Sequence, residues 1–553
     1  MALPRFFSRV ADAVGPVAAI APVVLAERLR NVRVVVSAGD GCGAAPRRDG
    51  LLLAVNLLAR LYPRVEIIAD PGTGNLAAAH GQVINPELEV HVASSWGELQ
   101  RARDRLPEVR SVVLCMGENA QRPEAAGQAE GPVHVVECIA SGWNVLIDRS
   151  AEVAVSEGNG RALRGLPLYE PAPAAALAAA AVGVGEVFRA VFAVELGEKG
   201  RTAPQPGGFN LITGGKAQAG PDLSEDLVDV GVVHLVGAGA VGQACVLTLS
   251  LMPLTGELVV VDPQHVELSN LQRYVLTVDA DEGASKTALV ARALAGTHLT
   301  VSQIPAKWGE HDRTGPGQDT VLVALDSAVD RLAVAAGLPG RAYNAWTQPQ
   351  DLGWSRHEAF GASPCLACLY YPDRPRPSDH EVIATALGQH PLRMLSYLML
   401  GMPVGLALPA VLDVAGMPLP IEAPAWTHMS LLDDLIAAGV VDRERSAAWA
   451  GQRIGQLYRD GVCAGGLLAV GQLPTEVLVP LAHQSALAGI ALATSLLAAS
   501  DPSLRDLRGD AVEYRFDVLR GLPQVLPRPR ERTASCFCSD ADYVAAASGW
   551  LND

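Results

Sequence analysis

Short apolar runs alternate with helical patterns in the region before residue 198. Runs rich in β-branched residues at 32–36 and 65–68 flank a stretch at 51–61 whose apolar side chains recur with helical spacing. Further short apolar runs follow at 111–114 and 143–147. Strands that alternate with helices are typical of sheets whose parallel strands are joined by helices. We therefore predict an α/β domain in the first part of the chain.

The same pattern starts again after residue 230. An apolar run at 232–236 is followed by a glycine-rich turn and then by helical spacing as far as Leu251. Later strand-like runs at 258–261 and 321–325 are each followed by an aspartate. Repetition of one pattern at this scale indicates an internal duplication. We predict two Rossmann-like halves, of which the first is degenerate.

The remaining segments complete the predicted organisation. Turn-forming residues crowd the stretch before residue 230, and helical patterns without strands fill the region after residue 373. A long apolar helix is expected at 477–499 and an edge strand at 512–518. The predicted divisions are an N-terminal domain (1–197), a linker (198–229), a second α/β domain (230–373 and 464–553) and a helical insertion (374–463).

Three apolar stretches raise the question of membrane insertion. Residues 10–26 follow two arginines but are interrupted by Asp12 and two prolines, which favours an amphipathic helix or packed arm over a signal peptide. Residues 394–412 contain two prolines and lack a flanking positive cluster, so we interpret them as a buried helix pair. Residues 171–196 carry charged side chains and predict a core-facing helix. We expect a soluble, cytoplasmic protein without a membrane partner.

The composition narrows the class of protein further. Hydrophobic residues make up 49% and charged residues 18% of the 553 residues, which predicts a folded chain. A net charge of −16 with 5% aromatic residues argues against a nucleic-acid partner. Nine cysteines are too few for a disulfide framework, and their odd number leaves at least one thiol free. This is the pattern expected in a reducing compartment.

A glycine fingerprint follows the first strand of the second half. It reads Gly237-Ala-Gly239-Ala-Val-Gly242 and lies between a predicted strand and a predicted helix. Glycines there allow a tight turn and close approach of the backbone to a phosphate, and the helix N-terminus favours an anion. Asp262, 20 residues after Gly242, is placed to bind ribose hydroxyls. Alone, these residues fit NAD binding, or a Rossmann unit without a ligand.

Charged residues beyond Asp262 favour a triphosphate over a dinucleotide. Arg273 ends the segment ELSNLQR, and Lys286 follows thirteen residues later. A triphosphate needs such cations to offset its charge, and it needs a metal held by carboxylates and phosphate oxygens. Asp326, directly after a predicted strand, is suited to Mg²⁺. Each residue alone could be a surface charge or a helix cap, but the ordered set favours a site.

The running order GAGAVG, VVVD, ELSNLQR, SK and ALDS resembles the ThiF/MoeB-type and ubiquitin-activating adenylation enzymes. The resemblance covers residues 230–327 and resumes at 474–538. Enzymes of this family bind ATP·Mg²⁺ and adenylate the C-terminal glycine of a ubiquitin-fold protein. The resemblance implies that the nucleotide is lined by Gly237, Gly239 and Gly242 and that its ribose is held by Asp262. It also implies that the phosphates are contacted by Asn270, Arg273 and Lys286, of which Arg273 and Lys286 are catalytic residues. Asp326 would bind Mg²⁺.

Three features depart from the family pattern. The second acidic residue of a D-x-D pair is Gln264 here, and the glutamine after the arginine is Tyr274. No N-terminal R-Y-x-R-Q segment supplies an arginine from a neighbouring domain. The candidates for that role, between which the sequence does not choose, are Arg5, Arg9, Arg47 and Arg48.

Two cysteine pairs lie where the resembling enzymes have their zinc ligands. Cys365 and Cys368 form a C-x-x-C, and Cys536 and Cys538 form a C-x-C close to residue 553. Four thiolates can hold Zn²⁺ in a tetrahedron, so we predict a structural zinc site. Four unliganded thiols are the alternative, because the family uses C-x-x-C for the second pair as well.

A further cysteine is the candidate nucleophile. In the resembling enzymes a cysteine in this crossover segment takes the activated protein as a thioester, and Cys463 has that position here. A thiolate is a strong nucleophile, and neighbouring glycines allow an exposed loop. The alternative is a small buried residue. Six other side chains are assigned to packing: Cys42, Cys115, Cys138, Cys245, His234 and His483.

The first half differs at the nucleotide position. Its glycines read Gly39-x-Gly41-x-Gly43, and neither an Asn-Leu-Gln-Arg run nor a following lysine accompanies them. Eukaryotic ubiquitin-activating enzymes pair an inactive adenylation domain with an active one. The layout is also similar to that of bacterial enzymes from ubiquitin-like conjugation operons linked to antiphage defence. We predict an inactive first half, and a monomeric pseudo-dimer or a homodimer.

The resemblance thus implies an enzyme that activates a ubiquitin-like protein and passes it from Cys463 to a conjugating-enzyme-like protein. A sulfur-carrier adenylase of thiamine or molybdopterin synthesis would share the ATP site, but it needs neither the first half nor the insertion. An NAD-dependent oxidoreductase would leave Arg273, Lys286 and the cysteine pairs without a task. A non-catalytic scaffold would not need the phosphate contacts.

Overall fold

The structure is a computed structural model of the whole chain, and it divides into two compact units. One unit comprises Met1–Tyr371 and Leu478–Asp553, and the other comprises Pro372–Val477. The structure describes residues 27, 29–101, 110–122, 133–151, 169–193, 207–218, 226–310, 320–347, 352–370, 379–407, 429–438, 449–457, 481–509, 512–516, 526–528 and 530–552. The segment at 10–26 and Cys463 lie outside these residues.

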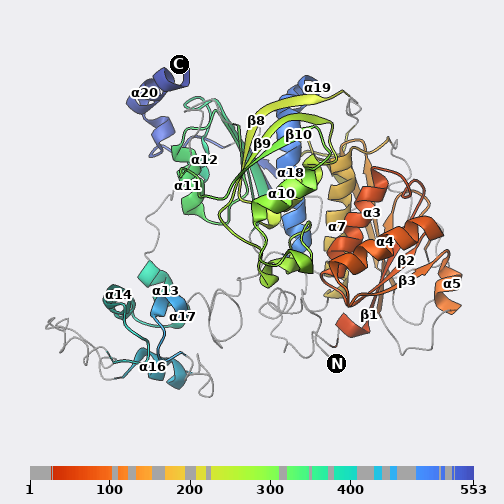
Figure 1. Cartoon of the computed structure of the whole chain (residues 1–553), viewed down its shortest axis with the longest axis horizontal. Coiled ribbons are helices and arrows are strands. Elements are labelled where there is room, and N and C mark those ends of the chain that lie inside the picture. The colour runs from red at the N-terminus through yellow and green to blue at the C-terminus, as the bar shows by residue number, and fades with distance from the viewer. Residues whose placement is uncertain are drawn as a thin grey trace. The chain divides into compact units, whose positions relative to one another are not determined.

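The first sheet is built from the N-terminal half (Figure 1). Its spatial order is β3-β2-β1-β4-β5-β6-β7, in which β1 to β5 pair in parallel and β6 and β7 are antiparallel. The strands are β1 (Val32–Ala38), β2 (Arg64–Ile68), β3 (Glu89–Ala93), β4 (Arg110–Met116), β5 (Val133–Ser141), β6 (Asn144–Ala151) and β7 (Gly207–Asn210). The helices are α3 (Arg47–Ala59), α4 (Pro71–Ile84), α5 (Trp96–Arg101) and α7 (Pro173–Val191).

The second sheet has the order β10-β9-β8-β11-β12-β13-β14-β15. Its strands are β8 (Val228–Val236), β9 (Leu254–Val261), β10 (Leu299–Ile304), β11 (Thr320–Val323), β12 (Arg341–Thr347), β13 (Leu352–Glu358), β14 (Glu513–Phe516) and β15 (Leu526–Arg528). The helices of this half are α9 (Ala240–Leu249), α10 (Lys286–Leu294), α11 (Ala328–Ala336), α12 (Leu366–Tyr370), α18 (Ala482–Ser500), α19 (Pro502–Arg505) and α20 (Ala541–Asn552). A 3-10 turn, η2, spans Leu268–Gln272.

The two sheets repeat one topology. In each, the first strand along the chain lies between the second and the fourth, with the third at the edge: β3-β2-β1-β4 in one sheet and β10-β9-β8-β11 in the other. A fifth parallel strand and then antiparallel strands follow in both. This order is typical of Rossmann-like folds. The predicted α/β class with two Rossmann-like halves is therefore confirmed.

The halves meet through equivalent long helices, α7 and α18, which lie side by side (Figure 1). Their side chains belong to one continuous hydrophobic core that reaches both sheets. A Cβ placed on Gly489 of α18 would lie 2.3 Å from the carbonyl oxygen of Val241 in α9, and one on Gly50 of α3 would lie 2.7 Å from that of Ala176 in α7. Glycine is thus required at both helix contacts.

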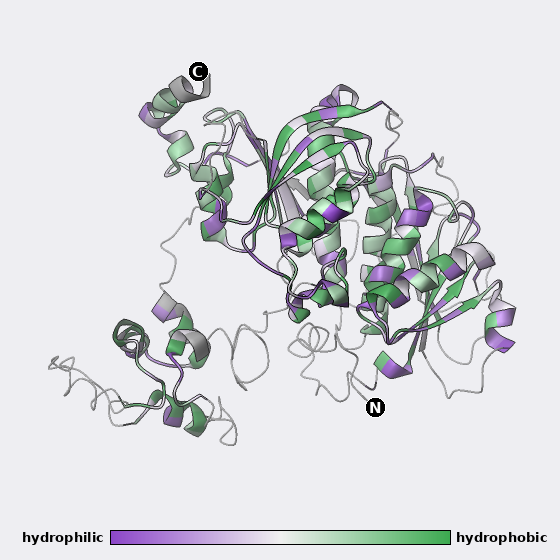
Figure 2. Cartoon of the chain, in the orientation of Figure 1, coloured by the Kyte–Doolittle hydropathy of each residue, from purple (hydrophilic) through white to green (hydrophobic). Residues whose placement is uncertain are grey.

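The first of these helices, α7, corresponds to the apolar stretch at 171–196 that raised the membrane question. Pro173–Val191 and Ala482–Ser500 are long and apolar enough to span a bilayer, but 100% and 94% of their most apolar windows are buried inside the structure. Figure 2 shows their apolar colouring beside that of the strands. Burial on all sides is the pattern of a core helix.

The other unit is helical in its described residues. It contains α13 (Asp379–Leu387), α14 (Pro391–Leu400), α16 (Leu431–Ala437) and α17 (Ile454–Leu457), which share a small core that includes Met394, Tyr397 and Trp449. The helical patterns predicted after residue 373 correspond in the described residues to helices such as α13 and α16. The predicted helix pair at 394–412 corresponds in part to α14, and residues 408–412 lie outside the described residues.

Two expectations need correction. Residues 198–229 were predicted to be a linker, yet β7 (Gly207–Asn210) lies there and pairs with β6 as the last strand of the first sheet. This strand was missed because it contains two glycines, and glycine is a turn signal in sequence patterns. Several strands were also missed: the outer strands β3 and β10 are largely solvent-accessible, so they lack a continuous apolar run.

Candidate functional site

The glycine loop connects the end of β8 to α9. Gly237 has φ +96°, and a Cβ there would lie 2.7 Å from the carbonyl oxygen of Ala324. A Cβ on Gly242 would lie 2.1 Å from the carbonyl oxygen of Gly237, so neither position accepts another residue without a shift of backbone. No side chain caps α9, which begins directly after Gly239. Its first N–H groups are therefore available to an anion.

Asp262 fastens this loop to the next strand. It follows β9, it is 6% exposed, and its Oδ2 accepts a hydrogen bond of 2.7 Å from the backbone nitrogen of Ala238. Its Oδ1 accepts one of 2.8 Å from Gln264. Each carboxylate oxygen can accept a second hydrogen bond, so this geometry agrees with the predicted ribose contact while giving Asp262 a structural task as well.

Lys286 opens α10 and reaches the same loop. It is 4% exposed, and its Nζ donates to Gln264 Oε1 at 2.6 Å and to the Tyr274 hydroxyl at 3.1 Å. That hydroxyl lies 3.4 Å from a Cβ built on Gly239. Gln264 and Tyr274 were seen in the sequence only as departures from the family pattern. In the structure they are the residues that position the lysine.

The remaining predicted contacts lie on the segment around η2. Asn270 is used inside the turn, where its Oδ1 accepts from the backbone nitrogen of Glu267 at 3.1 Å. Arg273 ends η2 and is partly buried, and its Nε has no hydrogen-bond partner among the described residues. An arginine with a free buried donor suits a phosphate.

Asp326 completes the set. It follows β11, which pairs in parallel with β8, and its side chain is exposed. The glycine loop, Asp262 and Asp326 therefore follow three adjacent parallel strands and share the carboxyl edge of the sheet, where open α/β sheets bind ligands. An exposed carboxylate at this edge fits the predicted Mg²⁺ contact, since Mg²⁺ keeps water and phosphate ligands besides one or two carboxylates.

The equivalent loop in the first half is held by hydrogen bonds to its own backbone. The backbone nitrogens of Gly39 and Asp40 donate to the carbonyl oxygens of Met116 and Glu118 at 2.6 and 2.7 Å. Asp70, which follows β2 as Asp262 follows β9, caps α4 by accepting from two backbone nitrogens at 3.1 Å. The inactivity of the first half stays a prediction. Of the arginine candidates, Arg47 pairs with Glu170 and Arg48 with Asp49, while Arg5 and Arg9 lie outside the described residues.

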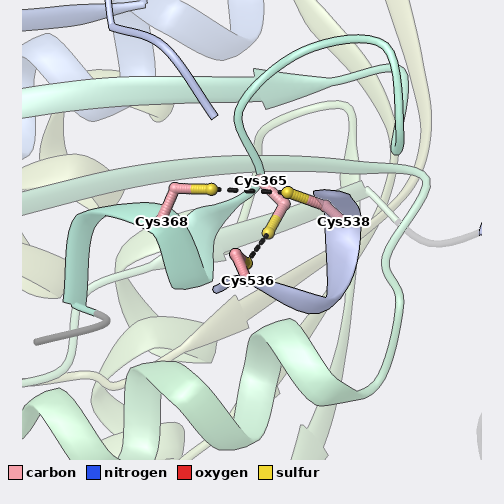
Figure 3. Close-up of side chains that lie close together, drawn as sticks. All are labelled: Cys365, Cys368, Cys536 and Cys538. Carbon is pink, nitrogen blue, oxygen red and sulfur yellow. Dashed lines mark hydrogen bonds between the residues drawn. The ribbon is translucent and has the colours of Figure 1, made fainter. Parts of the chain in front are cut away.

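Four cysteines from distant segments converge beside β13 (Figure 3). The sulfur atoms of Cys365 and Cys536 are 3.5 Å apart, those of Cys368 and Cys538 are 3.4 Å apart, and all four lie within 4.8 Å of one another. Cys365 is partly buried and the other three are buried. Tetrahedral Zn²⁺ with Zn–S bonds of about 2.3 Å spaces its thiolates by about 3.8 Å. The donor set and its spacing therefore fit zinc, including the C-x-C pair.

Backbone and arginine contacts support this cluster. The backbone nitrogen of Thr533 donates to Cys368 Sγ at 3.5 Å, and Arg530 Nη2 donates to the Cys368 carbonyl oxygen at 2.8 Å. The neighbouring Cys365 thiol lowers the pKa of the Cys368 thiol below its ordinary value. N–H donors near a sulfur favour the thiolate that a metal requires.

The other described cysteines are packing residues, as predicted. Burial raises the pKa of Cys42 to about 11 and that of Cys115 to about 12, and it raises the pKa of Cys138 and Cys245 further. Such thiols are poor nucleophiles at neutral pH. His234 and His483 are likewise buried, at 4% and 3% exposure. Cys463 lies outside the described residues, so its role stays a prediction.

The fold and the glycine loop define a Rossmann-like nucleotide-binding protein with a duplicated architecture. Residues 216–387 of the chain match the ThiF family. This match supports ATP-dependent adenylation of a substrate as the activity. This agrees with the resemblance drawn from the glycine, arginine and lysine motifs.

Similar proteins span different shares of the chain. An uncharacterized protein, y4jF of Sinorhizobium fredii, is 32% identical over 99% of this chain and 96% of its own length. The SAMP-activating enzyme E1 of Haloferax volcanii is 32% identical over 30% of this chain and 63% of its own length. E. coli MccB with ATP is 23% identical over 26% of this chain and 45% of that chain, with a TM-score of 0.22, which is too low to support an argument.

Proposed function

We propose that this protein uses ATP·Mg²⁺ to adenylate the C-terminal carboxylate of a ubiquitin-like protein and then takes the acyl group on Cys463 as a thioester. The observation that carries the proposal is the placement of Lys286 beside the glycine loop. The lysine is buried, and its partners in the described residues, Gln264 and Tyr274, are neutral. Its charge is therefore left for a ligand, and a triphosphate is the anion that suits this edge of the sheet.

The first chemical step joins the substrate carboxylate to the α-phosphate of ATP, and pyrophosphate leaves. Arg273 and Lys286 offset charge on the phosphates during this transfer, and Asp262 holds the ribose. A bound Mg²⁺, held by Asp326 and phosphate oxygens, would neutralise further charge on the leaving group. Positioning and charge neutralisation supply the rate here, because no protein nucleophile is needed in this step.

The second step moves the acyl group to sulfur. The Cys463 thiolate attacks the acyl carbon of the adenylate, a thioester forms and AMP leaves. A conjugating-enzyme-like protein would accept the thioester next. The helical unit, Pro372–Val477, contains Cys463 in its sequence. This unit would present the cysteine to the partners.

We also propose a metal site, an oligomeric state, a location and a biological role for the protein. The four-cysteine cluster would hold structural Zn²⁺, and the duplicated halves would allow a monomer to form a complete site, although a homodimer is the alternative. We expect the protein in the cytoplasm. A role in bacterial antiphage defence rests on the similar layout of enzymes from such operons.

The test combines purified protein, ATP·Mg²⁺ and a candidate ubiquitin-like protein with a free C-terminal glycine. Intact mass measured without reductant should show an adduct that thiols cleave and that is missing in Cys463→Ala. A matched control, Cys245→Ala, removes a buried thiol and should keep the adduct.

Other outcomes separate the alternatives. Partner-dependent ATP–pyrophosphate exchange without an adduct would keep adenylation, remove Cys463 from the mechanism and favour a sulfur-carrier adenylase. Binding of NAD in preference to ATP would overturn the proposal.

A further inference from the structure

The segment that carries Arg273 and Tyr274 is held from two sides. We call residues 271–277 the Arg273 loop. Gln243 of α9 holds one side of this loop and is completely buried. Its Oε1 accepts hydrogen bonds from the backbone nitrogen of Leu276 at 3.2 Å and from the Thr277 hydroxyl at 2.9 Å. This helix begins at the glycine loop, so this contact joins two parts of the same half.

The other side of the loop is held by the first half. Arg60, directly after α3, is 1% exposed. Its Nη1 donates to the carbonyl oxygen of Leu271 and its Nη2 to that of Thr277, the latter at 3.1 Å. Asn56, one turn earlier, donates from Nδ2 to the carbonyl oxygen of Val275 at 3.0 Å and accepts from Arg60 Nε at 2.8 Å. Three carbonyl oxygens of the Arg273 loop are thus occupied by two side chains more than 200 residues away in sequence.

This arrangement is costly for stability alone. Arg60 is fully buried, and among the described residues no carboxylate pairs with it. Burial without a counter-ion lowers its pKa to about 9. A buried charge satisfied only by neutral oxygen atoms, here two backbone carbonyls and the Asn56 amide, is less favourable than an apolar side chain of similar size. Such a residue is retained where the geometry it imposes matters.

The Arg273 loop leads directly to the phosphate position. Tyr274 extends from its middle, and the Tyr274 hydroxyl accepts from Lys286 Nζ at 3.1 Å, with Nζ 5.2 Å from the centre of the ring. The same hydroxyl lies close to Gly239 of the glycine loop. A shift of the loop would therefore displace Arg273 and the support of Lys286 together.

We propose that Asn56 and Arg60 are positioning residues for the ATP site: by holding the Arg273 loop, the first half sets Arg273 and Lys286 against the phosphates. This inference rests on the proposed function, because it assumes that the ligand is ATP. It gives the first half, which lacks the Asn-Leu-Gln-Arg run and the following lysine, a role in the chemistry of the second half through the loop backbone.

The test compares phosphate-dependent and phosphate-independent binding in the full chain. Arg60→Met removes the donors but keeps an unbranched side chain. Affinities for ATP·Mg²⁺ and for adenosine are measured by calorimetry, adenosine by competition. We expect ATP affinity to fall about tenfold or more, and adenosine affinity to change less than about twofold, because adenosine carries no phosphate for Arg273 or Lys286 to bind. Arg60→Lys should recover part of the ATP affinity.

A matched control removes another buried arginine of the same half. Arg33 is 3% exposed and pairs with Glu66 on the face of the first sheet where Trp96 packs. Arg33→Met also removes a buried arginine from the first half, but it should leave the ratio of ATP to adenosine affinity unchanged. If Arg60→Met does not fold, Asn56→Ala tests the same contact and should lower the ratio to a smaller extent.

The outcomes are distinct. Wild-type ratios in folded Arg60→Met and Asn56→Ala would overturn the inference and keep the proposed function. An equal loss of ATP and adenosine affinity in both would also overturn it, because the role would then be general stability. A wild-type protein that does not prefer ATP to adenosine would overturn the proposed function and the inference together.

Discussion

Replacing Lys286 by methionine separates a role in binding phosphate from a role in stability. The lysine is 4% exposed, and within the described residues it has Gln264 and Tyr274 as partners but no carboxylate. Methionine keeps much of the length and the apolar stem while removing the charge. The substitution therefore deletes a cation that the folded protein does not neutralise.

The magnitudes follow from burial and charge. A hydrogen bond to a charged group contributes about 1.5–3 kcal/mol, and about 1.4 kcal/mol corresponds to a tenfold change in affinity. ATP should therefore bind Lys286→Met about 10- to 150-fold more weakly. The free energy of unfolding should change by less than about 2 kcal/mol, because the lost hydrogen bonds are offset by removal of a buried ammonium group.

The assay measures ATP·Mg²⁺ and adenosine binding by calorimetry, and unfolding by chemical denaturation. Lys307→Met is the matched control, because Lys307 is exposed and far from the glycine loop in sequence. It should bind ATP like the wild type. Unchanged ATP affinity in Lys286→Met would refute the assignment of this lysine to phosphate. An equal loss of adenosine affinity would refute it too.

Three other perturbations test the site and its scaffold. Asp262→Asn leaves one acceptor oxygen where two backbone N–H groups now bond, so denaturant unfolding should show a loss of about 1–3 kcal/mol, and ATP and adenosine should both bind more weakly; wild-type values would contradict this. Burial lowers the pKa of His483 from 6.5 to about 3. The histidine therefore does not reduce the free energy of unfolding above pH 6.5, and it lowers that free energy by up to about 1.4 kcal/mol per pH unit between pH 6.5 and 3. His483→Phe, beside Phe188, should make the acid limb of the stability profile shallower, and an unchanged limb would remove the histidine as its cause. Elemental analysis should find about one zinc per chain and none in Cys536→Ser, which should unfold at a lower temperature; a metal-free wild type would show four free thiols instead.

Local patterns in the sequence determined much of the fold. The strands at 32–36, 65–68 and 258–261 were predicted because each is buried on both faces and therefore continuously apolar. The glycine fingerprint could be recognised in the sequence because tight turns and close backbone approach restrict the residue type at a few fixed positions. Edge strands such as β10 could not be recognised in the sequence, since many of their side chains are partly or fully exposed to solvent.

Other features were decided by the tertiary structure. Nothing around Arg60 or Asn56 in the sequence indicates that they bind the Arg273 loop, 200 residues further on, because a side chain that bonds to backbone carbonyls leaves no pattern in the residues it contacts. Gln264 and Tyr274 were recorded as departures from a family, and their common task of holding Lys286 needed the fold to bring them together. The hydrophobic periodicity of a segment indicates only which of its side chains face the core and which face solvent. Contacts between distant segments depend instead on how two sheets pack, through helices such as α7 and α18, and this is set by the shape of the whole core.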